Sequence, residues 1–330
     1  MLYGPIYLYW FLLSIRARSF FFFSAANPGI RNGGFLLESK KEIYEILPPA
    51  YYPHTLFFHH GTPPAVVLEM VNAGKIQFPL IAKPDIGMRG MAVKKLENTD
   101  ELLAYAGQSQ VDFLVQAFIP YEKEIGIFYY RYPREEKGEI SGIVGKEFLK
   151  LTGDGVSSLE ELLQEDRRFI LQLKTLRAEF GEALQQVLPA DAEYVMVPYG
   201  NHSRGAKFLD LSNLIDAQLT DTIDRICKEI PGFYFGRMDI RYQSWEELKQ
   251  GKHFSIIELN GAGSEPTHIY DPKHSVFFAW KEIIRHWNIL AKISILNHRI
   301  TKAPYMLTRD GLAMFRENAA YVKLIAPGKK

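Results

Sequence analysis

The sequence predicts an α+β fold with mixed and antiparallel sheets, because β-rich and helix-like segments alternate along the chain without an internal repeat. Three observations favour this class. Residues 125–132 and 139–151 are both β-rich and are joined by the polar turn PREEKG, as in a hairpin. The apolar run FPLIAKP (78–84) has the length of a strand and stops at a proline. Between residues 214 and 230 the apolar residues recur with the helical period, which predicts the buried stripe of a helix.

The other elements follow from local signals. Pro48 and Pro49 stop one helix, Gly74 ends another, and Ser157 with Glu160 suggests a capping box that opens a third. In the first half we expect a strand at 20–24, a glycine-rich loop at 27–34, helices at 37–47, 66–73 and 97–107, a strand that runs through Val93 and a strand at 112–119. In the second half we expect helical structure to about Val187, strands at 234–242 and 253–260, and an amphipathic helix at 276–297.

The overall composition excludes several classes of protein. A chain of 330 residues that is 47% apolar can bury a large core, so it is not disordered, and its length suggests two or three lobes. The 39 basic and 38 acidic residues leave a formal charge of +1, without the electrostatic footprint of a nucleic-acid-binding protein. We therefore expect no nucleic-acid partner. The single cysteine, Cys227, lies in a helical pattern and predicts a small buried thiol in a reducing, cytoplasmic setting.

The chain begins with an unusual apolar segment. Residues 2–15 carry no charge, Arg16 and Arg18 follow, and four phenylalanines come directly after them. The run is shorter than the roughly 20 residues of a membrane-spanning helix, and it lacks the charged start and cleavage site of a signal peptide. Its aromatic content and the two arginines suit an interfacial anchor. Peripheral membrane contact through residues 2–23, burial on the protein's own core and burial in a homodimer all stay open.

Polar side chains share one face of a predicted strand pair near the C-terminus. Arg237, Asp239 and Arg241 lie two residues apart and point to the same side of one strand, and Glu258 and Asn260 do so on the next. If these faces meet in a cleft, their carboxylate and amide oxygens offer the hard ligands that Mg²⁺ prefers. An ordinary half-solvated strand pair with cross-strand salt bridges is the alternative.

The predicted strand 78–84 has a lysine near its end, and the loop after it contains two glycines. Lys83 ends the apolar run, and the loop after it contains Gly87, Arg89 and Gly90. Such a loop can place backbone N–H groups over phosphates, with the lysine as a point charge, although a plain turn with a surface lysine has the same pattern. Neither a Walker A pattern nor a G-x-G-x-x-G after a strand occurs, so P-loop and Rossmann nucleotide sites are unsupported.

Taken in order, these pieces resemble the ATP-grasp superfamily, in the branch that includes D-alanine:D-alanine ligase and cyanophycin synthetase. The resemblance covers about residues 37–272. It implies two α/β lobes that clasp ATP, with two lysines on the phosphates, a glycine-rich flap, backbone groups at the adenine and an acidic residue at the ribose. The matching positions are Lys40, Lys83, Gly87, Arg89, Gly90, Gln116, Ala117, Phe118 and Glu124.

The same resemblance implies a metal site and a set of catalytic residues. Asp239, Glu258 and Asn260 match the residues that hold two Mg²⁺ in the family. Arg237 matches the arginine that faces the transferred phosphate. The segment GDGVSSLEELL (153–163) and the loop at 199–210 resemble elements of the cyanophycin synthetase branch. The expected catalytic or substrate-facing residues are Arg237, Arg241, Lys146, Arg204 and His202, with solvated loop positions as the alternative for the last three.

Three departures from the family pattern stand out. The hinge position that is usually acidic is Gln116 here, and the spacing from it to Glu124 is one residue longer than usual, so the ribose contact could fall on Glu122 instead. Only about 36 residues precede the motif region, where peptide-forming members have a domain that helps to hold the acceptor. The expected division is a short apolar segment at 1–36, a first lobe at 37–111, a second lobe with the metal site at 112–272 and C-terminal helices at 273–330.

The implied reaction is ATP-dependent joining of a carboxylate to an amine. ATP phosphorylates the carboxylate to an acyl phosphate, the amine attacks it, and ADP and phosphate are released. The partners are then a small-molecule carboxylate and a small-molecule amine, with ATP and Mg²⁺ as cofactors. A kinase that phosphorylates a hydroxyl and a non-catalytic nucleotide-binding protein are the alternatives.

Overall fold

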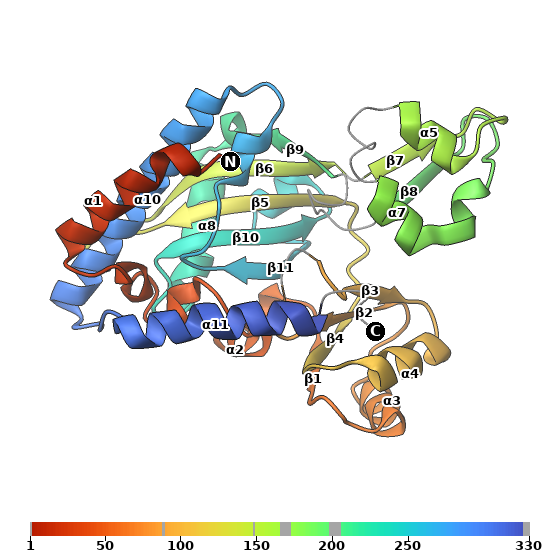
Figure 1. The fold of residues 1–330 in the computed structure, drawn as a ribbon, viewed down its shortest axis with the longest axis horizontal. Helices are drawn as coiled ribbons and strands as arrows, with labels where there is room; N and C mark the ends of the chain where they lie inside the picture. The colour runs from red at the N-terminus through yellow and green to blue at the C-terminus, as the bar shows by residue number, and fades with distance from the viewer. Residues whose placement is uncertain (1, 88–89, 148, 166–172, 198–205, 326–330) are drawn as a thin grey trace.

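The computed structural model describes residues 2–87, 90–147, 149–165, 173–197 and 206–325 (Figure 1). Its strands form three sheets, flanked by helices, and every strand pairing among the described residues is antiparallel. The α+β class predicted from the sequence is confirmed.

The largest sheet has five strands and carries the predicted hairpin and strand pair. Its order is β11 (Phe254–Asn260), β10 (Phe235–Tyr242), β5 (Lys123–Tyr130), β6 (Glu139–Glu147) and β9 (Lys207–Asp210). One face packs on α8 (Ala217–Glu229) and α9 (Trp245–Lys249), where the apolar stripe of α8 meets the inward-pointing residues of β10. Cys227 lies in this core as a buried free thiol, as predicted.

The N-terminal and C-terminal helices pack together at the end of this sheet (Figure 1). They are α1 (Tyr7–Ala17), α10 (Val276–Ile300) and α11 (Thr308–Ile325), and the turn η2 (Phe22–Ala25) lies against α10. The strand expected at 20–24 is wrong. Phe21, Phe22 and Phe23 are all buried, and a strand would alternate them between two faces, whereas a tight helical turn places all three inside. None of the described helices is long and apolar enough to cross a membrane.

A four-stranded sheet forms a second layer with its own core. Its order is β1 (Thr55–Phe58), β4 (Phe113–Ala117), β2 (Leu80–Pro84) and β3 (Lys94–Leu96), covered by α3 (Pro64–Ala73) and α4 (Thr99–Gln108). Because β4 is hydrogen-bonded between β1 and β2, it belongs to this sheet, and the division expected after residue 111 falls too early. The strand expected to end at Val93 is misplaced: residues 91–92 form a turn, and β3 begins after Val93, at Lys94.

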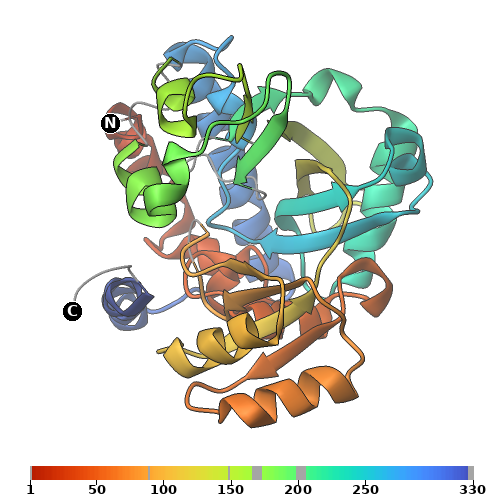
Figure 2. The same ribbon diagram turned by 90° about the vertical axis from the view of Figure 1, so that its right-hand side faces the viewer.

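A small separate unit follows β6. It consists of β7 (Leu149–Thr152), β8 (Glu193–Val197), α5 (Leu159–Glu165), α7 (Leu173–Phe180) and the turn η5 (Gly181–Gln185), around a leucine-rich core. In Figure 1 it lies on the same side of the large sheet as the four-stranded sheet, and Figure 2 shows that the two stand apart. The capping box predicted from Ser157 and Glu160 is shifted by one residue to Ser158 and Glu161, because the Ser157 hydroxyl bonds to Asp154 instead.

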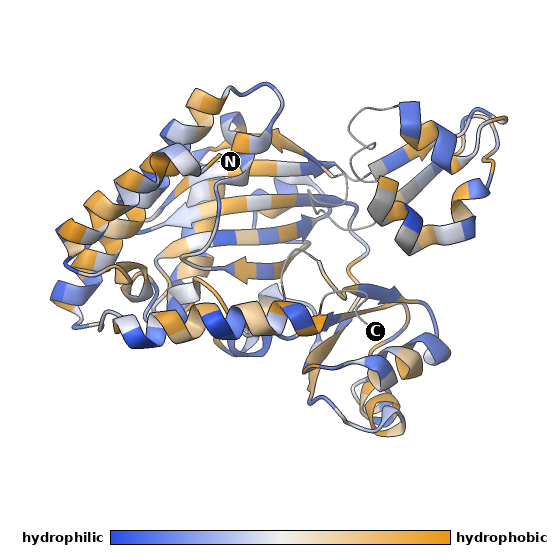
Figure 3. Cartoon of the chain, viewed as in Figure 1, coloured by the Kyte–Doolittle hydropathy of each residue, from blue (hydrophilic) through white to orange (hydrophobic). Residues whose placement is uncertain are grey.

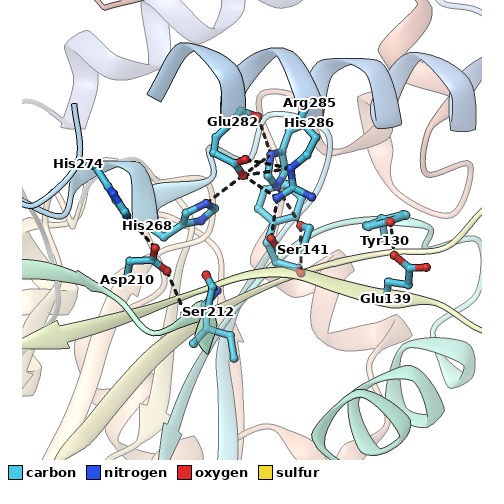
Figure 4. A network of polar contacts seen from close by, with 12 residues as sticks. Tyr130, Glu139, Ser141, Asp210, Ser212, His268, His274, Glu282, Arg285 and His286 are labelled. Atoms are coloured by element: carbon cyan, nitrogen blue, oxygen red, sulfur yellow. Dashed lines mark hydrogen bonds and ion pairs between the residues drawn. The ribbon is translucent and has the colours of Figure 1, made fainter. Parts of the chain in front are cut away.

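A buried polar network holds α10 against β6 (Figure 4). Glu282 accepts from Arg285, and its Oε2 lies 3.2 Å from His268 Nε2. His286 Nε2 lies 2.9 Å from the Ser141 hydroxyl, and its Nδ1 lies 2.8 Å from the carbonyl oxygen of Glu282. Burial, and then the charge of Arg285, lower the pKa of His286 to about 3. In the pH range in which this imidazole begins to bind a proton in the unfolded chain, it is therefore still neutral in the folded protein.

This network predicts a loss of stability in mild acid. Between pH 7 and pH 5 the unfolded chain binds a proton at position 286 and the folded protein does not, so the free energy of unfolding should fall by about 2 kcal/mol from this group. His286→Gln should reduce the slope of stability against pH in that window, measured by urea unfolding. His60→Gln, at an exposed position, is the control and should leave the slope unchanged. Equal slopes for wild type and His286→Gln would contradict the assignment.

Candidate active site

A cleft of about 670 Å³ lies between the five-stranded and the four-stranded sheets. Strands β2 and β4 supply one side, and β5, β6, β10 and β11 supply the other, with helix α2 (Lys40–Ile46) at its edge. Among the described residues, five cationic and five acidic side chains line it: Lys40, Lys83, Lys146, Arg237, Arg241, Glu38, Glu124, Asp239, Glu258 and Glu265. The positive and negative side chains of this one cavity thus balance in number, as they nearly do over the whole chain.

The paired strands β10 and β11 bring their polar faces together, as the alternation predicted. In the antiparallel register Asp239 lies opposite Glu258, and Arg237 lies opposite Asn260. Met238, which points the other way, is completely buried in the core. All four polar residues line the cleft. The alternative of a merely half-solvated pair does not hold, because Asp239 is only 4% exposed.

Asp239 is held between two cations. Arg237 Nε lies 2.9 Å from its Oδ1, and Lys146 Nζ lies 2.9 Å from its Oδ2. Burial by itself would raise the pKa of Asp239, but the charges of Arg237 and Lys146 outweigh it and hold the pKa below its usual value. The carboxylate is therefore ionised.

Lys146 also binds a second buried carboxylate. Its Nζ lies 2.9 Å from Glu124 Oε1, and the other oxygen of Glu124 lies 3.4 Å from Arg241 Nε. Asp239 and Glu124 together raise the pKa of Lys146 against the opposing effect of its burial. The sequence places Lys146 at a substrate or a phosphate, and the structure places it on the cleft wall between two acids. Glu122, the alternative to Glu124, is exposed and lies outside the lining.

Gly126 allows the Arg237–Asp239 pair to form. It lies on β5 directly opposite Asp239, and a Cβ there would stand 2.8 Å from Val144 Cγ1, 3.0 Å from Asp239 Oδ1 and 3.1 Å from Arg237 Cδ. The arginine side chain can fold back along its own strand only because this position has no side chain. Gly126 was not among the site residues expected from the sequence, although a glycine inside a β-rich segment can indicate that other groups approach the backbone closely there.

Lys83 is a buried cation without a carboxylate partner. Its Nζ donates to Tyr44 Oη and Gln116 Oε1, both at 2.9 Å, and to the carbonyl oxygen of Ile257 at 3.3 Å. Among the described residues it forms no ion pair, and burial lowers its pKa to about 8. Gln116 offers Lys83 a neutral amide oxygen, and the charge of Glu258 offsets only part of the effect of burial.

A β-bulge supplies the third of these acceptors. The register of β10 and β11 shifts after Asp239, which pairs with Glu258, so that Ile240 pairs with Ile256 and Ile257 is left over. The Ile257 carbonyl oxygen accepts from Tyr44 Oη at 2.8 Å as well as from Lys83. Bulges re-aim backbone groups in this way next to functional sites. The bulge joins the two sheets across the cleft.

Lys40 approaches the same space from α2. Its Nζ lies 3.7 Å from Glu258 Oε1 and 3.5 Å from the carbonyl oxygen of Asp85, and a Cβ added at Gly87 would stand 3.3 Å from it. Gly87 and Gly90 line the cleft, and their predicted role as a flap over phosphates stays a prediction. Arg89 falls outside the described residues, and so do His202 and Arg204.

Glu38 is a cleft residue that was not expected from the sequence. This carboxylate accepts from the Gly261 backbone N–H at 2.8 Å and lines the cleft. Burial, only partly offset by that hydrogen bond, raises its pKa to about 7. The preceding loop sets its position: Gly33 and Gly34 accept from the backbone of Ala262 and Gly263, so the loop at 27–34 packs on the loop after β11. No local motif could reveal this, because the partner lies more than 220 residues away.

The residues predicted at the adenine hinge lie at one end of the cleft. Gln116, Ala117 and Phe118 all line it. Phe118 is contacted by two cations, with Lys95 Nζ at 4.8 Å and the Arg241 guanidinium at 5.8 Å from its ring centre. An aromatic side chain at this end, beside apolar residues of β2, offers a surface on which a planar ring could stack.

The residues predicted to hold Mg²⁺ have the right donors. Asp239 and Glu258 supply carboxylate oxygens from facing register positions, and Asn260 adds an amide oxygen. The buried Nδ2 of Asn260 has no hydrogen-bond partner, so this amide is not fixed by the protein. Both oxygens of Asp239 are engaged by Arg237 and Lys146, so a metal ion there competes with these cations. No cluster of three or more histidine, cysteine or acidic ligands occurs within the described ranges.

Comparison with known proteins gives distant structural similarity only. No family model and no curated protein matches the sequence. A bifunctional glutathione synthetase from Pasteurella multocida is 15% identical with a TM-score of 0.38, over 74% of this chain and 35% of that one. The VanG D-Ala:D-Ser ligase from Enterococcus faecalis is 13% identical with a TM-score of 0.42, over 78% of this chain and 61% of that one. The chain therefore spans less than two thirds of either protein, and its function has to be inferred from its own cleft.

The buried ion pairs predict that Glu124 and Glu122 differ sharply. Glu124→Gln leaves Lys146 and Arg241 with less compensation in a buried site, so the free energy of unfolding should fall by about 3 kcal/mol. Glu122→Gln, at an exposed neighbour, should change it by no more than about 0.5 kcal/mol. Chemical denaturation of both variants measures the difference, and equal stabilities would show that the ion pairs around Glu124 do not hold the cleft wall.

Proposed function

We propose that the protein is an ATP-dependent ligase of the ATP-grasp type, which joins a carboxylate to an amine through an acyl phosphate. The single observation that carries the proposal is Lys83, a buried ammonium group that contacts only neutral acceptors in a cleft lined by four other cations. A buried cation without a counter-ion is unfavourable unless an anion binds to it.

A polyphosphate fits this requirement better than a single carboxylate does. Lys83 approaches from the four-stranded sheet, Lys40 approaches from α2 at the edge of the cleft, and Lys146 and Arg237 approach from the five-stranded sheet. Several cations on facing walls match an anion that carries charge along its length, such as the triphosphate of ATP. The aromatic and apolar end of the cleft near Phe118 would then receive the base.

The acidic residues on the same wall support a role for metal ions. Asp239, Glu258 and Asn260 would hold Mg²⁺, which neutralises phosphate charge and orients the γ-phosphate when bound. Engagement of Asp239 by the metal would release Arg237 and Lys146 toward the phosphate oxygens. We infer that these two residues then bind the phosphoryl group, while Lys40 and Lys83 hold the rest of the triphosphate.

The expected chemistry needs no nucleophilic side chain. A substrate carboxylate oxygen attacks the γ-phosphorus of ATP, ADP leaves, and a substrate amine then displaces phosphate from the acyl phosphate to form an amide. Among the described residues the one thiol, Cys227, is buried away from the cleft, and burial raises its pKa. The protein's own contribution is to orient the two anions, to neutralise their charge and to exclude water.

The test is turnover with ATP, Mg²⁺ and a panel of amino acids and dipeptides, with phosphate release and amide formation measured by mass spectrometry. We expect phosphate release that requires both a carboxylate and an amine. Asp239→Asn should lower kcat at least about 100-fold while the circular dichroism spectrum stays native. Asp221→Asn, at an exposed carboxylate on α8, is the matched control and should keep full activity.

Three results would overturn the proposal. A stable phosphorylated product without free phosphate would identify a kinase instead of a ligase. Absence of any ATP binding, or full activity in Asp239→Asn, would remove the nucleotide and metal assignments.

A further inference from the structure

Helix α1 is apolar on both of its faces, although it lies at the outside of the molecule. Its inner face, with Trp10 and Leu13, is buried against the α10 core. Its outer face presents Leu8, Leu12 and Ile15, which are 76%, 61% and 74% exposed. Figure 3 shows hydrophobic residues along both α1 and the neighbouring α10. A helix that is hydrophobic all round is normally covered on all sides.

The exposed apolar surface continues onto neighbouring segments. Phe11 and Ile15 line a hollow of about 590 Å³ together with Phe20 and Leu307, from the segments after α1 and before α11. Leu307 is 62% exposed and Phe20 is 43% exposed. We call this continuous surface, formed by Leu8, Phe11, Leu12, Ile15, Phe20 and Leu307, the α1 patch.

The charged residues that α1 and its C-terminal end place next to the α1 patch are both positive. Arg16 and Arg18 are exposed at the end of the helix, and neither forms an ion pair within the described part of the chain. The first 37 residues contain no acidic residue at all. Arg18 also lines the hollow, with Ser14, Ser19 and Thr308 as the other polar residues and no carboxylate. The nearest carboxylate on α11, that of Asp310, is paired with Arg309.

We propose that the α1 patch binds the surface of a membrane that contains anionic lipids, with α1 lying in the plane of the interface. Apolar side chains of α1 would enter the acyl region while Arg16 and Arg18 contact lipid phosphates. At 11 residues α1 is about 16 Å long, which suits this orientation and is too short to span the bilayer. A second copy of the chain fits less well, because α1 and its flanking residues offer no acidic side chain to oppose the arginines of the other copy.

The proposal is independent of the reaction in the cleft, so the two can be tested separately. The test is co-sedimentation of the full chain with vesicles of phosphatidylcholine alone and of phosphatidylcholine mixed with phosphatidylglycerol. We expect binding to the anionic vesicles that weakens as salt is added. Arg16→Gln and Arg18→Gln should each weaken it about fivefold.

A second variant separates the apolar contribution from the charge. The double variant Leu12→Glu, Ile15→Glu should lose vesicle binding and keep its melting temperature, because both side chains are exposed in the free protein. Val156→Glu and Arg134→Gln, at exposed positions away from the α1 patch, are the matched controls and should bind as the wild type does.

Three outcomes would overturn the proposal. They are no binding of the wild type to anionic vesicles, equal binding to neutral vesicles, and unchanged binding of the double variant. Light scattering identifies the competing occupant: a wild-type dimer that Leu12→Glu, Ile15→Glu converts to a monomer, without vesicle binding, would show that a second copy covers the α1 patch.

Discussion

A chain of alternating buried charges runs across three strands and organises the cleft. It links Arg237, Asp239, Lys146, Glu124 and Arg241, which come from β10, β6 and β5. Each carboxylate lies between two cations, so removal of any one member leaves an uncompensated charge in a place that water reaches poorly. This series of buried charges therefore fixes the relative register of the three strands as well as the chemistry of their exposed ends. It also holds the pKa of Asp239 below its usual value and so keeps the carboxylate ionised.

Lys83 lies outside this series of charges, and our proposal that an anion binds in the cleft rests on that separation. The five-stranded wall is internally compensated, whereas the ammonium group on β2 contacts a phenol, an amide and the carbonyl oxygen of a β-bulge. These acceptors come from three different elements, α2, β4 and β11. The position of the Lys83 ammonium group therefore depends on the correct packing of all three.

Much of the site could be predicted because strand alternation is a local property. The spacing of Arg237, Asp239 and Arg241 was enough to place them on one face, and Glu258 and Asn260 on the facing strand. Glu38 and Gly126 were missed because their roles depend on contacts with residues far away in the sequence. The strand expected at 20–24 was wrong for a similar reason: three consecutive buried phenylalanines need a core on every side, and the sequence could not show that α10 and α11 supply it. Lys146 was found, but its two carboxylate partners depend on the register of β5, β6 and β10.

The most direct measurement is a crystal structure with a non-hydrolysable ATP analogue and Mg²⁺. The account predicts the triphosphate between the two walls, within hydrogen-bond distance of Lys40 and Lys83, with metal on Asp239 and Glu258 and with Lys146 or Arg237 moved from Asp239 onto a phosphate oxygen. An analogue that binds elsewhere, or a cleft in which Lys83 keeps only its three neutral acceptors while nucleotide is bound, would contradict it.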